Sequence, residues 1–114
     1  MKIDRASAEH YIWKDVCDGW HFVKNENLSI IAEKMPPNTA EDMHCHEKSR
    51  QFFYILSGTA HMILDDEIVC LSSGEGIEIP PLTHHQMKND SDGFVEFFVV
   101  SMPKSHGDRI MVAK

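Results

Sequence analysis

The sequence predicts an all-β domain, a sandwich or a barrel built from short strands. Short runs rich in apolar, β-branched and aromatic residues recur along the chain, and Gly, Pro, Asn, Asp or Ser clusters separate them at regular spacing. No apolar run approaches the ~20 residues that a membrane-spanning helix needs. We therefore predict one domain over residues 1–114, with its core over 28–103, additional N-terminal strands and a short C-terminal tail.

The first part of the chain alternates between aromatic runs and polar turns. Ser7 is a candidate N-cap for a short helical turn over residues 8–10. Residues 11–13 and 19–23 have strand-type composition, and the run over 28–35 ends at a pair of prolines. These features predict three strands before residue 36.

The rest of the chain is predicted to consist of short strands that are separated by turns. The glycine-rich and proline-rich positions between the apolar runs mark their ends. The predicted strands cover residues 43–46, 52–56, 59–64, 68–71, 77–79, 84–88 and 94–101.

Composition excludes several classes of partner. The net charge is −7, from 11 basic and 18 acidic residues, whereas nucleic-acid binding and anionic membrane surfaces both require a basic face. The first residues are polar and do not form a signal peptide. Three cysteines without C-x-x-C spacing indicate reduced thiols. We expect a cytoplasmic protein that binds neither nucleic acid nor membrane.

Three histidines are candidate metal ligands. His44 and His46 are two residues apart, so on a strand their side chains share one face, while Cys45 faces the other way as a small buried hydrophobe. His85 could close the site from another strand. Neutral imidazoles suit transition metals such as Zn, Cu, Fe and Ni. The alternative for the pair is a set of polar residues on an exposed strand.

Two stretches resemble the motifs of the cupin superfamily. Residues 38–58 resemble the first motif, G-x5-H-x-H-x3-4-E-x6-G, and residues 74–89 resemble the second, G-x5-P-x-G-x2-H-x3-N. The resemblance implies an antiparallel jelly-roll barrel with one divalent metal (Mn, Fe, Ni or Zn) in its mouth. Three positions depart from it. Asn38 and Leu82 stand where glycines are usual, and Gln51 stands where a glutamate ligand is usual. Asn38 tolerates the positive φ that such a turn needs.

Gln51 completes the predicted metal set. We expect the polar residues 47–50 to form a turn between antiparallel strands, which lets Gln51 face the histidines. Gln51 then either ligates the metal or hydrogen-bonds a ligand histidine or a bound water. An amide in place of a carboxylate leaves a divalent metal with its full charge, so we expect a stronger Lewis acid that favours anionic oxygen ligands.

The leading functional prediction is a small metalloenzyme that acts on a small oxygen-rich substrate, such as a sugar or keto acid, by isomerase-type chemistry. The same ligand set resembles that of small cupins that linearise unsaturated uronate sugars, but the acidic residue expected late in the chain is missing from residues 98–103. An iron-dependent dioxygenase and a non-enzymatic binding module are the alternatives. The sequence does not reveal a general base.

Other residues carry weaker signals. Phe53 and Met62 either line the pocket beneath the metal as substrate-binding residues or belong to the barrel core. Arg109 either binds a substrate carboxylate or is solvated, and we expect His61 and His84 to face away from the site. The N-terminal aromatic residues either form a homodimer interface, as the resemblance implies, or cap one end of the barrel. They are Tyr11, Trp13, Trp20 and Phe22.

Overall fold

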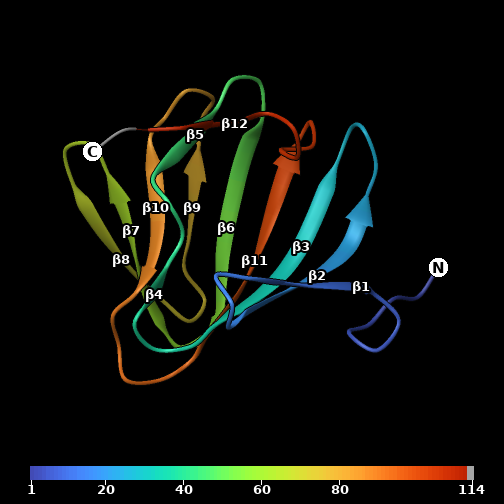
Figure 1. Cartoon of the computed structure of the whole chain (residues 1–114), viewed down its shortest axis with the longest axis horizontal. Helices are drawn as coiled ribbons and strands as arrows, with labels where there is room; N and C mark the ends of the chain where they lie inside the picture. Colours follow the sequence, from blue (N-terminus) through green and yellow to red (C-terminus); the bar gives the residue numbers. More distant parts are fainter. Residues whose placement is uncertain (113–114) are drawn as a thin grey trace.

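Two antiparallel sheets make up the computed structural model, which describes residues 1–112 (Figure 1). The first sheet has the order β1 (Glu9–Trp13), β2 (Cys17–Lys24), β3 (Ser29–Met35), β11 (Val95–Met102), β6 (Arg50–Ser57) and β9 (Gly76–Ile79). The second has the order β12 (Arg109–Met111), β5 (His44–His46), β10 (His85–Asn89), β7 (Thr59–Leu64) and β8 (Ile68–Ser72), and the short β4 (Thr39–Ala40) also pairs with β10. No helix is present in the part of the chain that the structure describes. The predicted all-β jelly roll is confirmed.

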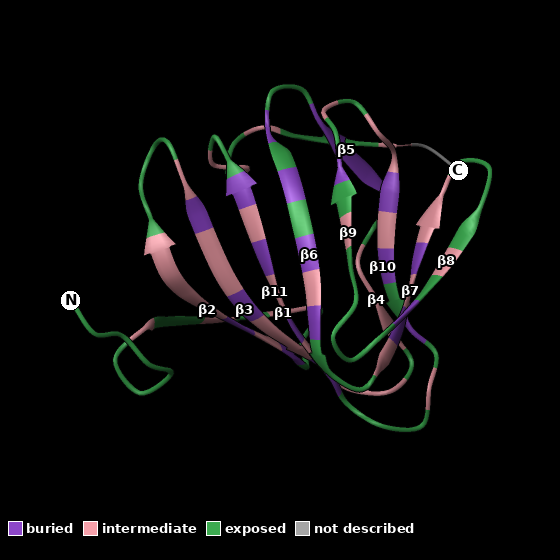
Figure 2. Cartoon of the chain, turned by 180° about the vertical axis from the view of Figure 1, so that it is seen from behind, coloured by how far each residue is buried: buried purple, intermediate pink, exposed green. Residues whose placement is uncertain are grey.

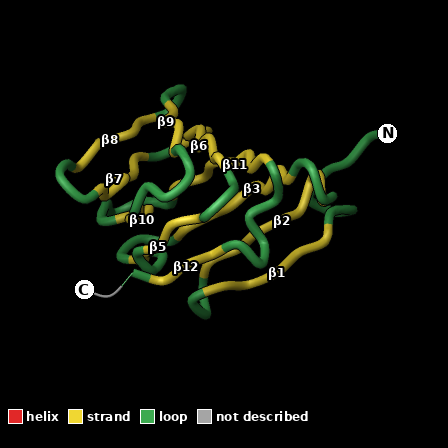
Figure 3. Tube along the Cα trace, turned by 90° about the horizontal axis from the view of Figure 1, so that it is seen from above, coloured by secondary structure: helices red, strands yellow, loops and turns green. Residues whose placement is uncertain are grey.

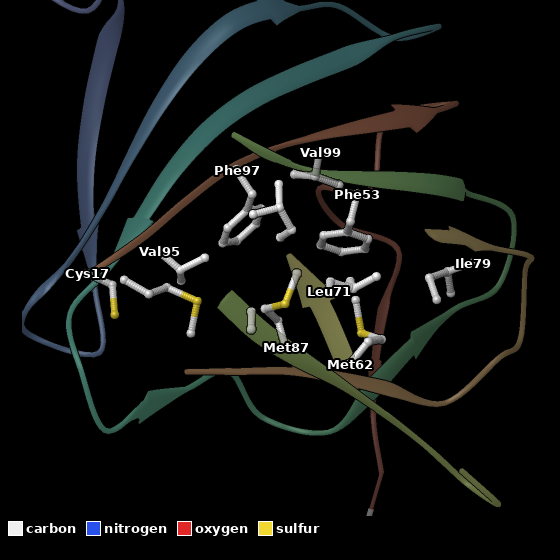
Figure 4. Packing of buried hydrophobic residues seen from close by; sticks show 12 residues of the cluster. Cys17, Phe53, Met62, Leu71, Ile79, Met87, Val95, Phe97 and Val99 are labelled. Atoms are coloured by element: carbon white, nitrogen blue, oxygen red, sulfur yellow. The ribbon is translucent and has the colours of Figure 1, made fainter. Parts of the chain in front are cut away.

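The apolar core lies between the two sheets. Along β6, Gln51, Phe53 and Ile55 are buried and alternate with more exposed residues, which Figure 2 shows as bands of colour. Phe53 and Phe97 from the first sheet face Met62, Leu71 and Met87 from the second (Figure 4). The face of each sheet that meets the other is therefore largely apolar, as the alternating sequence pattern requires, with buried polar side chains such as Gln51 as the exceptions.

Both chain ends belong to the sheets. β1 and β2 extend the edge of the first sheet, and β12 pairs with β5 at the edge of the second, as the view in Figure 3 shows. Asp108 fixes β12 because its carboxylate accepts backbone N–H groups of residues 47, 48 and 49 at distances of 3.2, 3.0 and 2.9 Å. The predicted polar tail is therefore partly a strand, and it lies beside the histidine pair.

Two local predictions are wrong. The turn over residues 5–7 is closed by Asp4, whose backbone oxygen accepts from the N–H of Ser7 and Ala8, and Glu9 already begins β1 because it pairs with His21. There is thus no helical turn over 8–10. The polar segment before Gln51 does not form a hairpin either, since β5 and β6 lie in different sheets. Gln51 reaches the histidines across the barrel.

Two residues at glycine positions of the motifs adopt left-handed backbone conformations. Asn38 has φ of 64° and its N–H donates to the carbonyl of Asn89, as its tolerance for positive φ allows. Leu82 has φ of 66°, and its N–H donates to the carbonyl of His46 at 2.7 Å. The loop before β10 therefore keeps the backbone shape that a glycine would give, and it anchors the strand that carries two histidines.

Leu82 is the position at which backbone strain is testable, because its side chain is 63% exposed and makes little contribution to the core. A left-handed conformation costs a non-glycine residue about 1–2 kcal/mol, so Leu82→Gly should be more stable than Leu82→Ala by about 0.5–1 kcal/mol in urea denaturation. At Asp66, an exposed turn residue outside the left-handed region, the alanine variant should be the more stable one. The same order at both positions would contradict the prediction.

Candidate metal centre

His44, His46 and His85 converge at one end of the barrel. His44 and His85 are directly opposite each other on the paired strands β5 and β10, and His46 follows on the same face of β5. All three side chains are buried, and their candidate ligand atoms lie within 4.8 Å of one another. The ring centroids of His44 and His85 are 4.3 Å apart. In residues 1–112 this is the group of His, Cys, Asp or Glu side chains whose spacing suits a metal ion.

Two of the imidazoles are oriented by backbone carbonyls. Nδ1 of His44 lies 2.7 Å from the carbonyl oxygen of Asp42, and Nδ1 of His85 lies 2.9 Å from that of Thr83. A carbonyl can only accept, so each Nδ1 carries the ring proton and each Nε2 keeps its lone pair. This arrangement fixes the tautomer that a metal ligand needs.

Gln51 presents an amide oxygen to the same site. Its Nε2 group donates to the hydroxyl of Ser101 at 3.0 Å, and its Oε1 lies 3.1 Å from Nε2 of His85. Since His85 holds its proton on Nδ1, two lone-pair atoms face each other across that distance. A cation that both atoms bind would relieve this contact. The geometry therefore suits the predicted ligand set.

Neither ring nitrogen of His46 has a well-formed hydrogen bond, although the backbone of Asp108 is close enough to affect the pKa of the imidazole. Both of its ring nitrogens are buried without a hydrogen bond, and the residue is only 5% exposed. Buried polar atoms are normally hydrogen-bonded, and leaving one unpaired costs about 1–3 kcal/mol. His46 is neutral, so one ring nitrogen carries a proton and the other an unpaired lone pair, and a transition metal bound beside the other two imidazoles would satisfy that lone pair.

Burial keeps these histidines neutral. It lowers the pKa of His44 to about 3 and that of His85 to about 4, and it also lowers the pKa of His46. Protons therefore do not compete for the lone pairs near neutral pH. Three neutral imidazoles and an amide oxygen fit a divalent transition metal.

A cavity of about 920 Å³ opens beside this centre. Its wall includes His44, His46 and Gln51 together with Phe53 at its base. Met62, the other predicted substrate-binding residue, is fully buried in the core and does not belong to the cavity wall. A space of this size accommodates a small molecule next to the histidines.

The cavity also contains two carboxyl groups that the sequence analysis missed. Glu33 of β3 and Glu41, which follows β4, both line it, and so does Tyr11 of β1. The Tyr11 hydroxyl donates to Oε2 of Glu33 at 3.4 Å, and Oε1 of Glu41 accepts the N–H of Met87 at 2.9 Å. A signal for Glu33 was present in the sequence, because it shares the core-facing side of its strand with Ile31 and Met35.

Arg109 places a positive charge at this centre. Its guanidinium donates to the carbonyl of Asp42 at 3.5 Å and lies 3.2 Å from Nδ1 of His44. It also belongs to the cavity wall. β12 brings Arg109 there through its pairing with β5, in which Arg109 lies opposite His46.

The remaining candidates lie elsewhere or have other roles. His61 and His84 face away from the centre and contact Asp90 and Asp65. Cys45 is buried, as its position between the two histidines predicts. Of the N-terminal aromatic residues, Tyr11 and Trp13 line the cavity, whereas the guanidinium of Arg5 covers the ring of Trp20.

The chain is similar in sequence to a known protein. It is 31% identical over 86 residues to the uncharacterized protein MJ1618 of Methanocaldococcus jannaschii, a match that covers 75% of this chain and 69% of that protein. No helix in the described residues is long and apolar enough to cross a bilayer.

Solved structures with 17% sequence identity share the fold. The polyketide cyclase RemF from Streptomyces resistomycificus has a TM-score of 0.85 and the match covers 100% of this chain and 86% of RemF. A predicted oxalate decarboxylase from Thermotoga maritima has a TM-score of 0.82, with coverage of 91% and 100%. KdgF from a Halomonas species has a TM-score of 0.80, with coverage of 89% and 91%.

The sequence model of the cupin domain matches residues 32–101, which include β5, β6, β10 and all four candidate ligands. With the jelly roll and the three converging histidines, this match shows that the chain belongs to the cupin family, as a small single-barrel member.

Proposed function

We propose that this cupin is a metalloenzyme that acts on a small oxygen-rich substrate, such as a sugar or keto acid, by isomerase-type chemistry. His44, His46 and His85 would hold one divalent transition metal, and Gln51 would assist through its amide oxygen. The observation that carries the proposal is the convergence of buried, neutral, incompletely satisfied imidazoles on the wall of a cavity. Sites with this combination of perturbed groups and concave shape are usually functional.

When bound, the metal supplies Lewis-acid polarisation of a carbonyl or hydroxyl oxygen, and the neutral ligand set leaves its positive charge undiminished. The chain's own residues complete the site. Ser101 orients the amide of Gln51, and the carbonyls of Asp42 and Thr83 orient two imidazoles. The guanidinium of Arg109 can bind a carboxylate or another anionic oxygen.

The names of two structural neighbours support this substrate class. One is a polyketide cyclase and another is a predicted oxalate decarboxylase. Polyketides and oxalate are both rich in carbonyl or carboxylate oxygens. A cavity with Arg109, two carboxyl groups and a phenol on its wall also suits a substrate with several oxygens, because each oxygen finds a hydrogen-bonding partner.

Metal content is the direct test. Protein purified without added metal should contain about one equivalent of a divalent transition metal by elemental analysis, and the His44→Ala/His85→Ala variant should contain none, because removing two of three imidazoles leaves too few ligands. His84→Ala is the matched control, since His84 is the chain neighbour of His85 but contacts Asp65, and this variant should keep its metal.

The outcomes separate the candidate functions. Absence of metal, and no uptake of added zinc, manganese, nickel or iron, would contradict the proposal and leave a binding module. Iron as the bound metal, with oxygen consumption in the presence of a diketone, would favour the dioxygenase instead.

The role of Gln51 is testable by restoring the charge. Gln51→Glu should bind zinc at least about tenfold more tightly than the wild type in chelator competition, because a carboxylate adds an attractive charge next to the cation. Gln51→Leu should bind zinc about 10–100-fold more weakly, because the oxygen is lost.

Gln86→Glu provides the matched control for this experiment. It adds the same negative charge beside His85, but on a side chain that contacts the backbone of Glu41. Its zinc affinity should stay close to that of the wild type. Equal affinities for Gln51→Glu and the wild type would mean that the oxygen of residue 51 does not contact the metal.

A further inference from the structure

The two carboxyl groups in the metal cavity have unequal surroundings. Glu41 accepts the backbone N–H of Met87, and the positive charge of Arg109 also favours its ionised form. Glu33 has the hydroxyl of Tyr11 as its hydrogen-bond donor, at the long distance of 3.4 Å. The carboxylate form is thus better stabilised at Glu41 than at Glu33.

The two carboxyl groups also interact electrostatically. Burial, followed by repulsion from Glu41, raises the pKa of Glu33 to about 8. Burial raises the pKa of Glu41 to about 7, against the opposing effects of the Met87 N–H and Arg109. Both carboxyl groups are therefore shifted toward the protonated form, and the hydrogen bond from the Met87 N–H offsets part of this shift at Glu41. Two carboxyl groups whose hydrogen bonds stabilise the ionised form unequally are the usual arrangement of an acid and a base in one site.

A ligand is indicated independently of these acids. The unpartnered nitrogens of His46 belong to a residue that is only 5% exposed and lines the same cavity. The cavity thus joins an unsatisfied ligand group and two carboxyl groups with unequal hydrogen-bond donors.

We propose that Glu41 is the proton acceptor and Glu33 the proton donor in the isomerisation of a small enolisable carbonyl compound, an α-hydroxy ketone or an α-keto acid, in this cavity. The inference rests on the proposed function, because the bound metal would polarise the carbonyl oxygen of the substrate. It assigns the general base and acid that the sequence left undefined, and it narrows the substrate to molecules with an acidic C–H next to a carbonyl.

The proton transfers balance without an oxidant or reductant. For an α-hydroxy ketone, the Glu41 carboxylate removes the proton from the hydroxyl-bearing carbon, and the electron pair of that C–H bond forms the C=C bond of an enediol. Glu33 protonates the former carbonyl oxygen. Glu41 then returns its proton to the neighbouring carbon, and Glu33 recovers one from the original hydroxyl, so both groups end as they began.

The charged and titratable groups that face the pair come from several elements. Tyr11 lies on β1, Cys17 on β2, Asp42 in the segment before β5 and Arg109 on β12. Burial raises the pKa of Tyr11, and also that of Cys17, so both stay protonated over the range in which the carboxyl groups titrate. Among these acidic groups, Glu33 and Glu41 are therefore the ones whose titration is shifted to near neutral pH.

Stability offers a readout without substrate. The carboxyl groups titrate near 4.5 when unperturbed and near 7 and 8 in the folded chain, so the folded state binds more protons and the free energy of unfolding falls as pH rises through these values. The histidines with lowered pKa values change the free energy of unfolding only below about pH 6.5. Between pH 6.5 and about 8.5, Glu33→Gln and Glu41→Gln should each flatten this decline. Glutamine matches the shape of a protonated glutamate, so both variants should fold.

Proton exchange tests the chemistry. We would incubate the metal-loaded protein with dihydroxyacetone or with pyruvate in D2O and follow loss of the C–H signals by proton NMR. The wild type should accelerate exchange in at least one probe, which identifies the carbonyl class. Glu41→Gln should lower this rate by about 100-fold or more, and Glu33→Gln by about tenfold. Glu78→Gln, on the outer face beside Arg50, is the matched control and should exchange like the wild type.

The result separates this inference from the proposed function. Metal content is measured on each sample, and failure to bind metal would overturn the proposed function while the pH dependence of stability still reports on the pair. Full metal content with no exchange in either probe, or with equal rates in Glu41→Gln and the wild type, would overturn the acid–base assignment alone. Carbon-13 NMR titration that shows Glu33 and Glu41 ionising independently near 4.5 would overturn it as well.

Discussion

The candidate centre depends on the pairing of β5 with β10. This contact sets His44 opposite His85, and the alternation of side chains on a strand brings His46 to the same face. Backbone carbonyls two residues before His44 and His85 accept hydrogen bonds from the Nδ1–H groups of these histidines. The same hydrogen-bonding groups that build the sheet thus determine both the position and the tautomer of the ligands. Loss of this register would move the imidazoles to another face.

The parts of the fold that follow from local patterns could be predicted from the sequence. Alternation and turn residues located most strands, and the i, i+2 spacing placed His44 and His46 on one face with Cys45 buried. Asn38 could be expected in a left-handed conformation from its residue type. Leu82 could not be expected there from its residue type, and in this conformation, with φ of 66°, its N–H donates to the carbonyl of His46.

The positions of Glu41 and Arg109 beside the centre depend on contacts between distant parts of the chain. Glu41 is near the centre because its segment bonds to β10 through Met87, and Arg109 is there because β12 pairs with β5. Neither contact has a local sequence pattern. The short segment before Gln51 was expected to be a turn between antiparallel strands, but it crosses between the sheets. Sequence spacing alone does not distinguish these two paths.

The centre combines several features that lower the stability of the folded chain. His46 keeps two unpaired nitrogens, Gln51 and His85 oppose lone pairs, and Glu33 and Glu41 have raised pKa values. The core around Phe97 and Met87 is packed with apolar side chains. The net free energy of unfolding of a small domain is low, so each unfavourable contact is a large fraction of it. Such conflicts at one end of an otherwise consistent fold are what a binding site produces, because the ligand satisfies the groups that the protein leaves unpaired.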